Sequence, residues 1–463
     1  MSPFDSETHE SGPDWLDEPA ARETLRWCLV VLWAEDPARM GEVAFVRGPT
    51  IVGRGPARDD DPHPRASWVE QRPGRIDHRG PLASRRLSRV QLCATPGRTS
   101  LGVENLGRAD MRCNGIGGTK VEARPGDVLM FEDALVLQVD RRPAALPEAP
   151  CAFPFGTPDP DGLVGESVAA WALRERLVFV GVRSEPALLT GETGSGKEVA
   201  ARALHRASAV GTRPWVSRSA ATLPEGLIDA ELFGTTRNYP NAGMPDRPGL
   251  VGQADGTTLF LDEIGELPTA TQAHLLRVLD SGEYTRLGEA RPRTSRFRML
   301  AATNRDVSTL KHDLAARFTL RVEVPGLTRR VADIPLLTRH IVKAVAHDDP
   351  LLADRFLDDA GEPRVAPSLV EALALHRWTS HVRELHRLLL QSLETSTGRF
   401  LDLTPQVAGG LTSRVKVDPA DLSAAQVKEA LAAVGGNRSQ AWKRLGLQSR
   451  DQLYRLLKRH GID

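Results

Sequence analysis

A glycine-rich run from Gly191 to Lys197 has the composition of a phosphate-binding loop. Its sequence, G-E-T-G-S-G-K, fits the pattern G-x-x-x-x-G-K, between a strand-like stretch at 186–190 and a helical one at 198–205. Such glycines let backbone N–H groups face phosphate oxygens, and the helix start adds a positive dipole end. A chance loop rich in Gly and Ser is the alternative. We expect ATP to be bound by Gly191, Glu192, Thr193, Gly194, Ser195, Gly196, Lys197 and Glu198, with Lys197 at the β- and γ-phosphates.

An acidic pair, Asp262 and Glu263, ends the apolar run Thr258-Leu-Phe-Leu. In parallel α/β sheets, ligands bind beyond the carboxyl ends of the strands. Asp262 is therefore placed to hold Mg²⁺, directly or through water, and Glu263 to polarise the attacking water. An apolar strand with an acidic end is common. At about 65 residues after Lys197, it predicts a nucleoside triphosphatase.

Composition excludes several classes of protein. The chain has 463 residues, which predicts roughly three domains, and its 60 basic residues balance 60 acidic ones, so any attraction to nucleic acid must be local. The four cysteines show no C-x-x-C spacing, which implies neither zinc nor a disulfide framework. No apolar stretch approaches 18 residues and no leader peptide is visible. We expect a cytoplasmic protein without membrane contact.

The order of sequence patterns predicts a multidomain chain: a β-sandwich, then an α/β P-loop domain with a helical lid, then a small all-α module. Short apolar runs between turn residues indicate the sandwich. Alternating helical and strand-like stretches indicate the α/β core. The expected boundaries are an acidic disordered tail (1–23), the sandwich (24–142), a Pro/Ala linker (143–161), the core (162–325), the lid (326–398), a second linker (399–419) and the helical C-terminus (420–463).

Residues 162–395 resemble the AAA+ domain of the sigma-54-dependent transcriptional activators. The resemblance rests on an ordered series of motifs: Leu163–Ser167, the P-loop followed by Glu198, Glu231–Gly234, Asp255–Pro268, Ala301–Asn304, Asp333–Leu337 and Val382–Leu385. It implies that Val164 borders the adenine pocket and that Asn304 senses the γ-phosphate. It also implies that Arg383 contacts the nucleotide from the lid.

AAA+ ATPases of this kind form rings, here expected to be hexameric, in which an arginine from the neighbouring subunit completes each site. The family places two basic residues near 313–317. Arg317 fits the second place, while Lys311 stands in the first. Lysine replaces the planar charge of an arginine finger imperfectly. Arg317 is therefore the expected catalytic group supplied in trans, and a solvated helix residue is the alternative.

The chain departs from this family in the loop that touches the sigma factor. Where the family carries G-A-F-T-G-A, this sequence has Asn238–Gly243, so that Pro240 and Asn241 replace the Phe and the Thr. Three prolines between 237 and 248 stiffen the loop. Tyr239 and Met244 are either new anchors for a target or residues that hold the loop against its own ring.

A second departure is Ser219, which stands where the family usually has Asn. The resemblance implies that this Asn holds the catalytic glutamate until the target is engaged. Serine is shorter and offers a hydroxyl instead of an amide. We expect altered coupling between hydrolysis and loop contact.

Residues 24–140 resemble a forkhead-associated (FHA) domain, a β-sandwich that reads phosphothreonine. The pair Gly53-Arg54 fits the phosphate-gripping loop, and 88–91 fits S-R-x-H with Gln91 in place of His, although 84–85 is a rival placement. Arginines and a hydroxyl make strong charge-assisted hydrogen bonds to phosphate. A sandwich that only mediates protein contacts is the alternative. The expected phosphopeptide-binding residues are Arg54, Ser88, Arg89 and Asn105.

Residues 420–463 resemble a Fis-type helix-turn-helix. Gly435-Gly-Asn437 ends one helix and caps the next, and Leu445-Gly-Leu447 forms the turn. From 438 to 463 there are seven Lys or Arg and two Asp, so a neutral chain ends in a basic module. The expected DNA-binding residues are Ser449, Arg450, Gln452, Arg455 and Lys458.

These patterns together predict a transcription regulator that hydrolyses ATP, binds DNA at an upstream activator site and is gated by a phosphothreonine-containing protein. Its expected further partner is RNA polymerase with sigma-54. Two alternatives stay open. One is an AAA+ regulator that no longer engages sigma-54, and the other is a non-catalytic scaffold that binds phosphopeptide and DNA.

Overall fold

The computed structural model describes residues 25–149 and 151–414 and part of the segment 424–462, namely 424, 427, 428, 431, 436–438, 441, 442, 445, 447 and 450–462. Several expectations lie outside the described residues. They are the acidic tail (1–23), Ser449, the end of the second linker and most of the first C-terminal helix.

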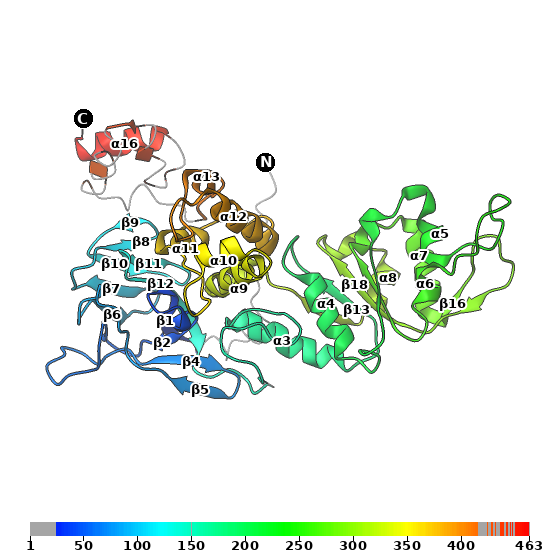
Figure 1. The fold of residues 1–463 in the computed structure, drawn as a ribbon, viewed down its shortest axis with the longest axis horizontal. Coiled ribbons are helices and arrows are strands. Elements are labelled where there is room, and N and C mark those ends of the chain that lie inside the picture. The colour runs from blue at the N-terminus through cyan, green and yellow to red at the C-terminus, as the bar shows by residue number, and fades with distance from the viewer. Residues whose placement is uncertain are drawn as a thin grey trace, which may run out of the picture.

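Twelve short strands form two antiparallel sheets in the N-terminal β region (residues 25–143), as Figure 1 shows. One sheet has the order β5-β4-β2-β1-β12-β11-β8-β9 and the other β10-β7-β6-β3. Leu29 and Val31 of the first sheet share a core with Leu92 and Leu101 of the second. The strands are β1 (Leu25–Ala34), β2 (Val43–Phe45), β3 (Thr50–Val52), β4 (Trp68–Arg72), β5 (Arg75–His78), β6 (Leu92–Pro96), β7 (Leu101–Asn105), β8 (Met111–Cys113), β9 (Ile116–Gly117), β10 (Lys120–Ala123), β11 (Val128–Phe131) and β12 (Leu135–Pro143).

The central α/β core is built on a parallel sheet with the strand order β14-β15-β18-β13-β19. Helices cover both faces, with α3 and α4 on one and α5 to α8 on the other, which confirms the expected parallel-sheet P-loop domain. The strands are β13 (Ala187–Thr190), β14 (Val216–Ser219), β15 (Thr258–Asp262), β18 (Arg298–Thr303) and β19 (Leu320–Glu323), with a small hairpin of β16 (Glu283–Tyr284) and β17 (Arg293–Thr294). The helices are α3 (Val168–Gly181), α4 (Lys197–Arg206), α5 (Ile228–Phe233), α6 (Gly249–Gln253), α7 (Thr269–Ser281) and α8 (His312–Arg317).

A helical lid follows the core and contains α9 (Ile334–His347), α10 (Pro350–Phe356), α11 (Pro367–Ala374), α12 (His381–Thr395) and α13 (Pro405–Gly409). The expectation that a linker begins at 399 is wrong for its described part. Leu401 and Val407 are fully buried in the lid core, and Leu401 pairs with Val365. Burial of these side chains holds the segment on the lid, and the backbone N–H of Arg414 donates to Leu375 O at 2.7 Å.

The N-terminal β region is docked directly on the lid (Figure 1). Leu32 and Val136 belong to the same buried cluster as the lid residues Leu336 and Leu373, and the indole nitrogen of Trp33 donates to the carbonyl oxygen of Val365 at 2.8 Å. Strand β1 is therefore apolar on both faces, because one face meets the second sheet and the other meets the lid. The segment 143–161, expected to be a linker, packs on the folded parts at both of its ends. Strand β12 extends to Pro143, and Phe153 stacks on Trp171 of α3.

The described part of the C-terminus contains α16 (Arg450–His460). Its apolar side chains share a small core with residues from the preceding segment: Val427, Ala441, Leu445, Leu447, Leu453, Leu456 and Leu457. Among the described residues, no helix is long and apolar enough to cross a membrane.

Candidate functional site

The carboxyl ends of three neighbouring strands bring the expected nucleotide-binding motifs together. The P-loop follows β13, Asp262 ends β15, and Asn304 follows β18, which lies between the other two in the sheet. The side-chain amide of Asn304 donates to the hydroxyl of Thr193 in the P-loop at 2.9 Å. Parallel strands place their following loops at one edge, so residues up to 111 positions apart along the chain meet here.

The P-loop adopts backbone conformations that favour glycine. Gly194 has a φ of 76° and Gly196, at the start of α4, a φ of 107°, both in the left-handed region. Lys197 Nζ donates to the carbonyl oxygens of Gly191 and Glu192 at 2.8 and 3.1 Å. The hydroxyl of Ser195 is buried and has no hydrogen-bond partner among the described residues. An orphaned hydroxyl and a lysine whose ammonium donates to loop carbonyls are groups that a bound phosphate could satisfy.

The two acidic residues lie at the mouth of this loop. Burial raises the pKa of Asp262, and the nearby Glu263 and Glu198 carboxylates add to the rise, while the Glu263 N–H and Lys197 oppose it. Burial likewise lowers the pKa of Lys197 against the pull of both acids. Glu263 has a φ of 53°, and its Oε2 accepts a hydrogen bond from Ser219 Oγ at 3.0 Å. Ser219 therefore directly contacts the expected catalytic base.

The lid closes over the P-loop through contacts that sequence reasoning missed. Val382 N donates to the carbonyl oxygen of Gly194 at 3.0 Å, and the imidazole of His381 is hydrogen-bonded to the carboxylate of Glu192. A Cβ at Gly194 would lie 2.2 Å from Ser380 O, so glycine permits this approach. His381 is fully buried with a φ of 43°. The only signal in the sequence was its place two residues before Arg383, which is itself exposed beside the loop.

Two further predicted residues border this site. Val164 is buried and packs in the same cluster as Leu327 and Val331 of the lid. Arg317, at the end of α8, is half-exposed, and its guanidinium forms an ion pair with the exposed Asp280 of α7. Within one protomer Arg317 is thus on the outer surface of the core. Its expected role would have to be exercised on another subunit.

Comparisons with known proteins bear on this ATPase-like centre. Residues 163–324 match the model of the Sigma-54 interaction domain family. The anaerobic nitric oxide reductase transcription regulator NorR of Aeromonas hydrophila subsp. hydrophila is 32% identical over 365 residues, which cover 72% of this chain and 69% of that protein. The chain belongs to the family of sigma-54-dependent transcription regulators. Its central domain is accordingly of the AAA+ ATPase type.

Other members of the sigma-54-dependent family show similar likeness. The nitric oxide reductase transcription regulator NorR2 of Cupriavidus necator is 34% identical over 339 residues, 65% of this chain and 63% of that protein, so the chain spans under two thirds of that relative. The transcriptional regulatory protein ZraR of Escherichia coli K12 is 30% identical over 309 residues, 64% of this chain and 68% of ZraR. The crystal structure of NtrX from Brucella abortus in complex with ATP aligns with 65% of this chain and 69% of NtrX, at 27% identity and a TM-score of 0.47.

The loop that departs from the sigma-54-dependent family is folded on itself. Asn238 organises its tip, since its N–H donates to Met244 O at 2.9 Å and its side chain accepts from Gly243 N at 2.9 Å. The ring of Tyr239 lies against Gly288, next to the hairpin of β16 and β17. Tyr239 and Met244 are 38% and 39% exposed, so each side chain packs in part on the protein and faces solvent in part. Pro240 and Asn241 are exposed between them.

In the N-terminal β region the turn at Ser88 lies beside Arg54. Arg54 N donates to Ser88 O at 3.0 Å, and a Cβ at Gly53 would lie 2.0 Å from Arg89 O. Ser88 Oγ accepts from the backbone of Arg108 at 2.9 Å, which brings in an exposed arginine that sequence reasoning missed. Its signal was the Asn105-Leu-Gly turn just before it.

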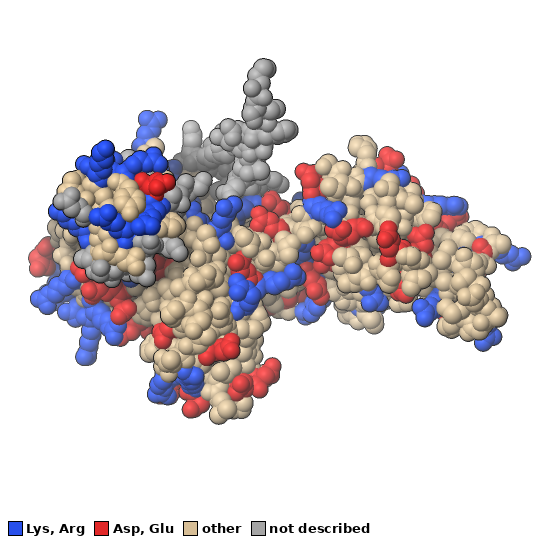
Figure 2. All heavy atoms as spheres, turned by 90° about the horizontal axis from the view of Figure 1, so that it is seen from above, with Lys and Arg blue, Asp and Glu red and all other residues tan. Residues whose placement is uncertain are grey.

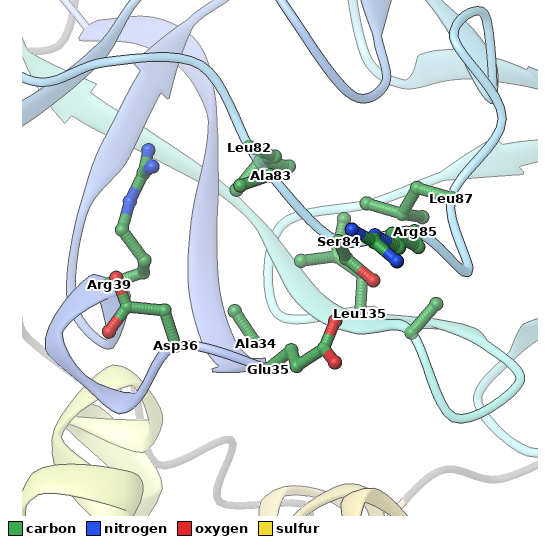
Figure 3. Close-up of a pocket in the computed structure, with 11 residues that line it drawn as sticks. Ala34, Glu35, Asp36, Arg39, Leu82, Ala83, Ser84, Arg85, Leu87 and Leu135 are labelled. Atoms are coloured by element: carbon green, nitrogen blue, oxygen red, sulfur yellow. The ribbon is translucent and has the colours of Figure 1, made fainter.

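Gln91 and Asn105 support this loop from within. The Gln91 side chain accepts from Ser88 N at 2.9 Å and donates to Asn105 Oδ1 at 2.8 Å, and Asn105 Nδ2 donates to Ala109 O at 2.9 Å. Both polar groups of the Asn105 side chain are therefore used inside the loop. A cavity of about 320 Å³ lies on the other side of the 82–87 segment (Figure 3), lined by the rival pair Ser84 and Arg85 together with Leu87 and the acidic Glu35 and Asp36.

The described C-terminal residues carry a concentration of positive charge. Figure 2 shows Lys and Arg side chains gathered over the C-terminal module. Arg450, Arg455 and Lys458 lie on α16, with Gln452 on the same helix. Arg450 also donates to the hydroxyl of Tyr454 at 3.1 Å. Leu453, Leu456 and Leu457 are buried, so the basic residues occupy the opposite, solvent-facing side of an amphipathic helix.

Proposed function

We propose that this chain is a DNA-bound regulator of transcription that hydrolyses ATP in a ring of subunits and is gated by phosphothreonine recognition. The observation that carries the proposal is the meeting of the P-loop, Asp262, Glu263 and Asn304 at one edge of the parallel sheet, closed by the lid. The proposed domains follow the sequence boundaries, except that the lid continues to about residue 414.

The nucleotide proposal assigns roles to the residues around the P-loop. Lys197 and the loop N–H groups hold the phosphates, Ser195 Oγ lies buried in the loop, and Val164 borders the base. Asp262 with phosphate oxygens would hold Mg²⁺, because a half-buried carboxylate and phosphate are the hard oxygen ligands that this ion prefers. The ion would neutralise charge developing on the phosphoryl group.

Hydrolysis is proposed to use Glu263 as the base that orients and deprotonates water. Asn304 is positioned by Thr193 to sense the terminal phosphate, and Arg383 reaches the nucleotide from α12. Arg317 is proposed to act on the site of the neighbouring subunit, since in its own protomer it forms an ion pair with Asp280 on the outer surface. These roles make a homo-oligomeric ring, hexameric by family resemblance, necessary for full activity.

The N-terminal β region is proposed to be an FHA-like reader of phosphothreonine. Support comes from three arginines, Arg54, Arg89 and Arg108, arranged around the Ser88 turn. A dianionic phosphate accepts several charge-assisted hydrogen bonds, each worth about 1.5–3 kcal/mol. Asn105 is assigned a supporting role in this site, since its side chain is engaged by Gln91 and Ala109.

The C-terminal module is proposed to be a Fis-type helix-turn-helix that binds DNA. Support comes from the basic, exposed side of α16 and from its packing on residues 427–447. Arg450, Gln452 and Arg455 would read base edges near the start of the helix, and Lys458 would contact phosphate. A neutral chain gains its attraction to DNA from this local charge.

The proposed target is RNA polymerase with sigma-54, as the family implies. One observation favours a second candidate, an AAA+ regulator that remodels a different target. The loop at 237–248 has lost the Phe and Thr of the family signature and is tied to its own hairpin by an ion pair between Asp246 and Arg286 at 2.8 Å. Such a loop offers Tyr239 and Met244 in place of the usual contact residues.

Two assays on the purified full chain test the proposal. ATP turnover should appear at concentrations where rings form and should be lost in Lys197→Ala. Absence of turnover in the native chain would leave only the phosphopeptide- and DNA-binding scaffold. Reconstituted open-complex formation with sigma-54 polymerase on promoter DNA then separates the two ATPase hypotheses, because ATP turnover without open complexes points to a different target.

A further inference from the structure

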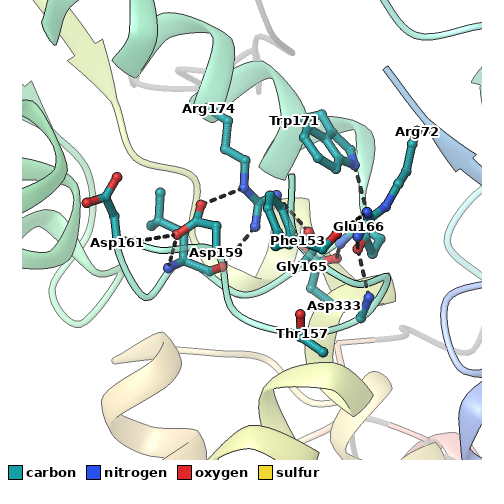
Figure 4. Close-up of polar contacts among 12 residues, drawn as sticks. Arg72, Phe153, Thr157, Asp159, Asp161, Gly165, Glu166, Trp171, Arg174 and Asp333 are labelled. Carbon is teal, nitrogen blue, oxygen red and sulfur yellow. Dashed lines mark hydrogen bonds and ion pairs between the residues drawn. The ribbon is translucent and has the colours of Figure 1, made fainter. Parts of the chain in front are cut away.

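Arg72, at the end of strand β4, is a residue of the N-terminal β region that reaches the ATPase core (Figure 4). Its Nη2 lies 2.7 Å from Glu166 Oε1, and its Nη1 donates to the carbonyl oxygen of Phe153. The guanidinium also lies over the Phe153 ring, 4.9 Å from its centroid. The side chains of Arg72 and Glu166 are only 9% and 2% exposed, so the pair is buried at the junction of the two parts of the chain.

Glu166 is the junction of three segments. Its Oε1 also accepts from Gly156 N at 2.8 Å, and its Oε2 accepts from the indole nitrogen of Trp171 in α3 at 3.1 Å. The backbone N–H groups of Glu166 and Ser167 both donate to Asp333 Oδ1 at 2.8 Å. The segment 163–167, which contains Val164, is thereby tied to the N-terminal β region on one side and to the lid on the other.

The same contacts continue to the P-loop. Asp333 N donates to Arg330 O at 2.9 Å, and the buried Arg330 donates through Nη2 to Ser195 O at 3.0 Å. Gly165 permits the close approach of Asp333, because a Cβ there would lie 2.5 Å from its carboxyl carbon. A continuous series of hydrogen bonds therefore runs from Arg72 through Glu166, Asp333 and Arg330 to Ser195.

Arg174 of α3 holds the opposite side of the 163–167 segment. Its guanidinium donates to the carbonyl oxygens of Gly165 and Leu163, each at 2.8 Å, and pairs with Asp159 at 2.8 Å. These contacts of Arg174 join the 163–167 segment only to the 143–161 linker and the α/β core. Arg72 is thus the polar contact by which the N-terminal β region joins the network, beside the apolar packing of Val30 and Val43 on Ala332. A buried carboxylate that loses its arginine is strongly disfavoured, so loss of Arg72 would force Glu166 and its segment to move.

We propose that Arg72 is a positioning residue for the nucleotide site, through which the N-terminal β region sets how the 163–167 segment and the Arg330–Asp333 turn stand against the P-loop. Loss of this contact weakens nucleotide binding without touching the nucleotide. The inference rests on the nucleotide binding proposed above and does not depend on phosphothreonine or DNA recognition. It makes the N-terminal β region part of the ATPase, in contrast to an independent module on a linker.

The test is titration calorimetry of the full chain with ADP and Mg²⁺. Arg72→Gln is expected to weaken ADP binding about tenfold, within the range of a network mutation remote from the ligand. The matched control is Arg75→Gln, in the adjacent strand, whose side chain is 73% exposed and pairs with Asp77; its affinity should equal that of the native chain. Arg72→Lys should recover part of the loss. In ATP turnover, the KM should rise for Arg72→Gln while kcat changes less than twofold.

Glu166→Gln supplies a second arm, since it keeps the shape and removes the charge that Arg72 balances. The double variant Arg72→Gln/Glu166→Gln should bind ADP no more weakly than Arg72→Gln alone, because both changes act on one contact. Native affinity in folded Arg72→Gln, or in Glu166→Gln if Arg72→Gln does not fold, would overturn the inference. Failure of the native chain and Arg75→Gln alike to bind ADP would instead reject the proposed nucleotide site and this inference with it.

Discussion

The hydroxyl of Ser219 donates a hydrogen bond to the carboxylate of Glu263, with 3.0 Å between Oγ and Oε2. Ser219 ends β14, and β14 pairs with β15, whose last residue Asp262 precedes Glu263. The carboxylate of Glu263, which is proposed to activate water, is thus hydrogen-bonded to the last residue of the neighbouring strand β14. A hydroxyl makes one such bond. Glu263 is therefore restrained in this chain by one hydrogen bond, where the asparagine expected from the family could donate two.

Ser219→Ala should raise the basal rate of ATP hydrolysis. Removal of the hydroxyl frees Glu263 to turn toward the nucleotide, and a hydrogen bond to a charged group is worth about 1.5–3 kcal/mol, so an increase in kcat of about tenfold or more is expected. Ser217→Ala, on the same strand with an exposed side chain, is the control and should leave kcat unchanged. A fall in kcat for Ser219→Ala would mean that Ser219 orients Glu263 for catalysis instead of restraining it.

Arg317→Ala should abolish turnover in homogeneous rings, with a loss of about 10³-fold or more, as for other arginine fingers. The decisive measurement mixes this variant with Glu263→Gln. Each is inactive alone, but a mixed ring contains sites with Glu263 from one subunit and Arg317 from the next. Recovery of turnover on mixing is expected because Arg317 is half-exposed and pairs with Asp280 on the surface of its own protomer.

The control is a mixture of two single variants, Lys197→Ala and Glu263→Gln, assayed in the same way. Both changes damage the site within one subunit, so no arrangement of the mixed ring restores it. No recovery in the Arg317→Ala mixture would place the action of Arg317 within its own subunit, against its observed position.

Glu384 gives the lid a pH dependence. Burial would raise the pKa of its carboxyl, but hydrogen bonds from Ser380 N, His376 and Thr379 outweigh burial and hold the pKa at about 2, below its ordinary value of 4.5. A carboxylate with a lowered pKa stabilises the fold above pH 4.5, and this contribution is lost as the pH falls from 4.5 toward 2. Glu384 caps the helix that carries Arg383.

Glu384→Gln should therefore lower the free energy of unfolding by roughly 1–2 kcal/mol at pH 7, because solvent screens part of the interaction. The difference from the native chain should shrink as the pH falls below 4.5. Denaturant unfolding at a series of pH values, followed by circular dichroism, measures this difference. Glu394→Gln, an exposed residue on the same helix, should match the native chain throughout. A difference that is constant with pH would show that the carboxylate charge is not the source of the stabilisation.

The sequence predicted the nucleotide-site motifs well because phosphate binding imposes local rules. Gly194 and Gly196 must have positive φ values, and an acid at the end of a buried strand falls at the sheet edge wherever that strand lies in the order. These constraints act over a few residues. Lys197 and Asp262 could therefore be predicted from spacing and pattern, while Asn304 was predicted from the family resemblance.

The contacts between domains could not be read in this way. Nothing near Trp33 in the sequence indicates that its indole meets Val365, which is 332 residues away. Leu401 and Val407 stand in a stretch that was predicted to be a linker, and the lid surface explains their burial. Nothing in the sequence around Arg72 indicates that it pairs with Glu166. In the same way, nothing around His381 indicates its hydrogen bond to Glu192. Long-range complementarity of this kind leaves no periodic or compositional trace.

The arginines around Ser88 lead to a prediction for phosphopeptide binding. Arg54→Ala and Arg108→Ala should each weaken the binding of a phosphothreonine peptide by about tenfold or more, because each removes a charge-assisted hydrogen bond worth about 1.5–3 kcal/mol. Asn105→Ala should also weaken binding, but through loss of loop order, since its amide bonds to Ala109 and Gln91. Fluorescence anisotropy with phosphorylated and unphosphorylated peptide libraries measures the effect.

The matched control is Arg98→Ala, which removes an exposed arginine in the turn between β6 and β7. Because Arg98 is followed by β7, whose far end Asn105 leads to the Ser88 loop, it lies at the opposite end of the sheet. A nonspecific attraction between phosphate and a basic surface would make all three arginine variants equal. Loss confined to Arg54 and Arg108, and seen only with the phosphorylated peptides, is the result expected of a built phosphate site. Equal binding by Arg54→Ala and the native chain would reject that site and leave the N-terminal β region as a structural partner of the lid.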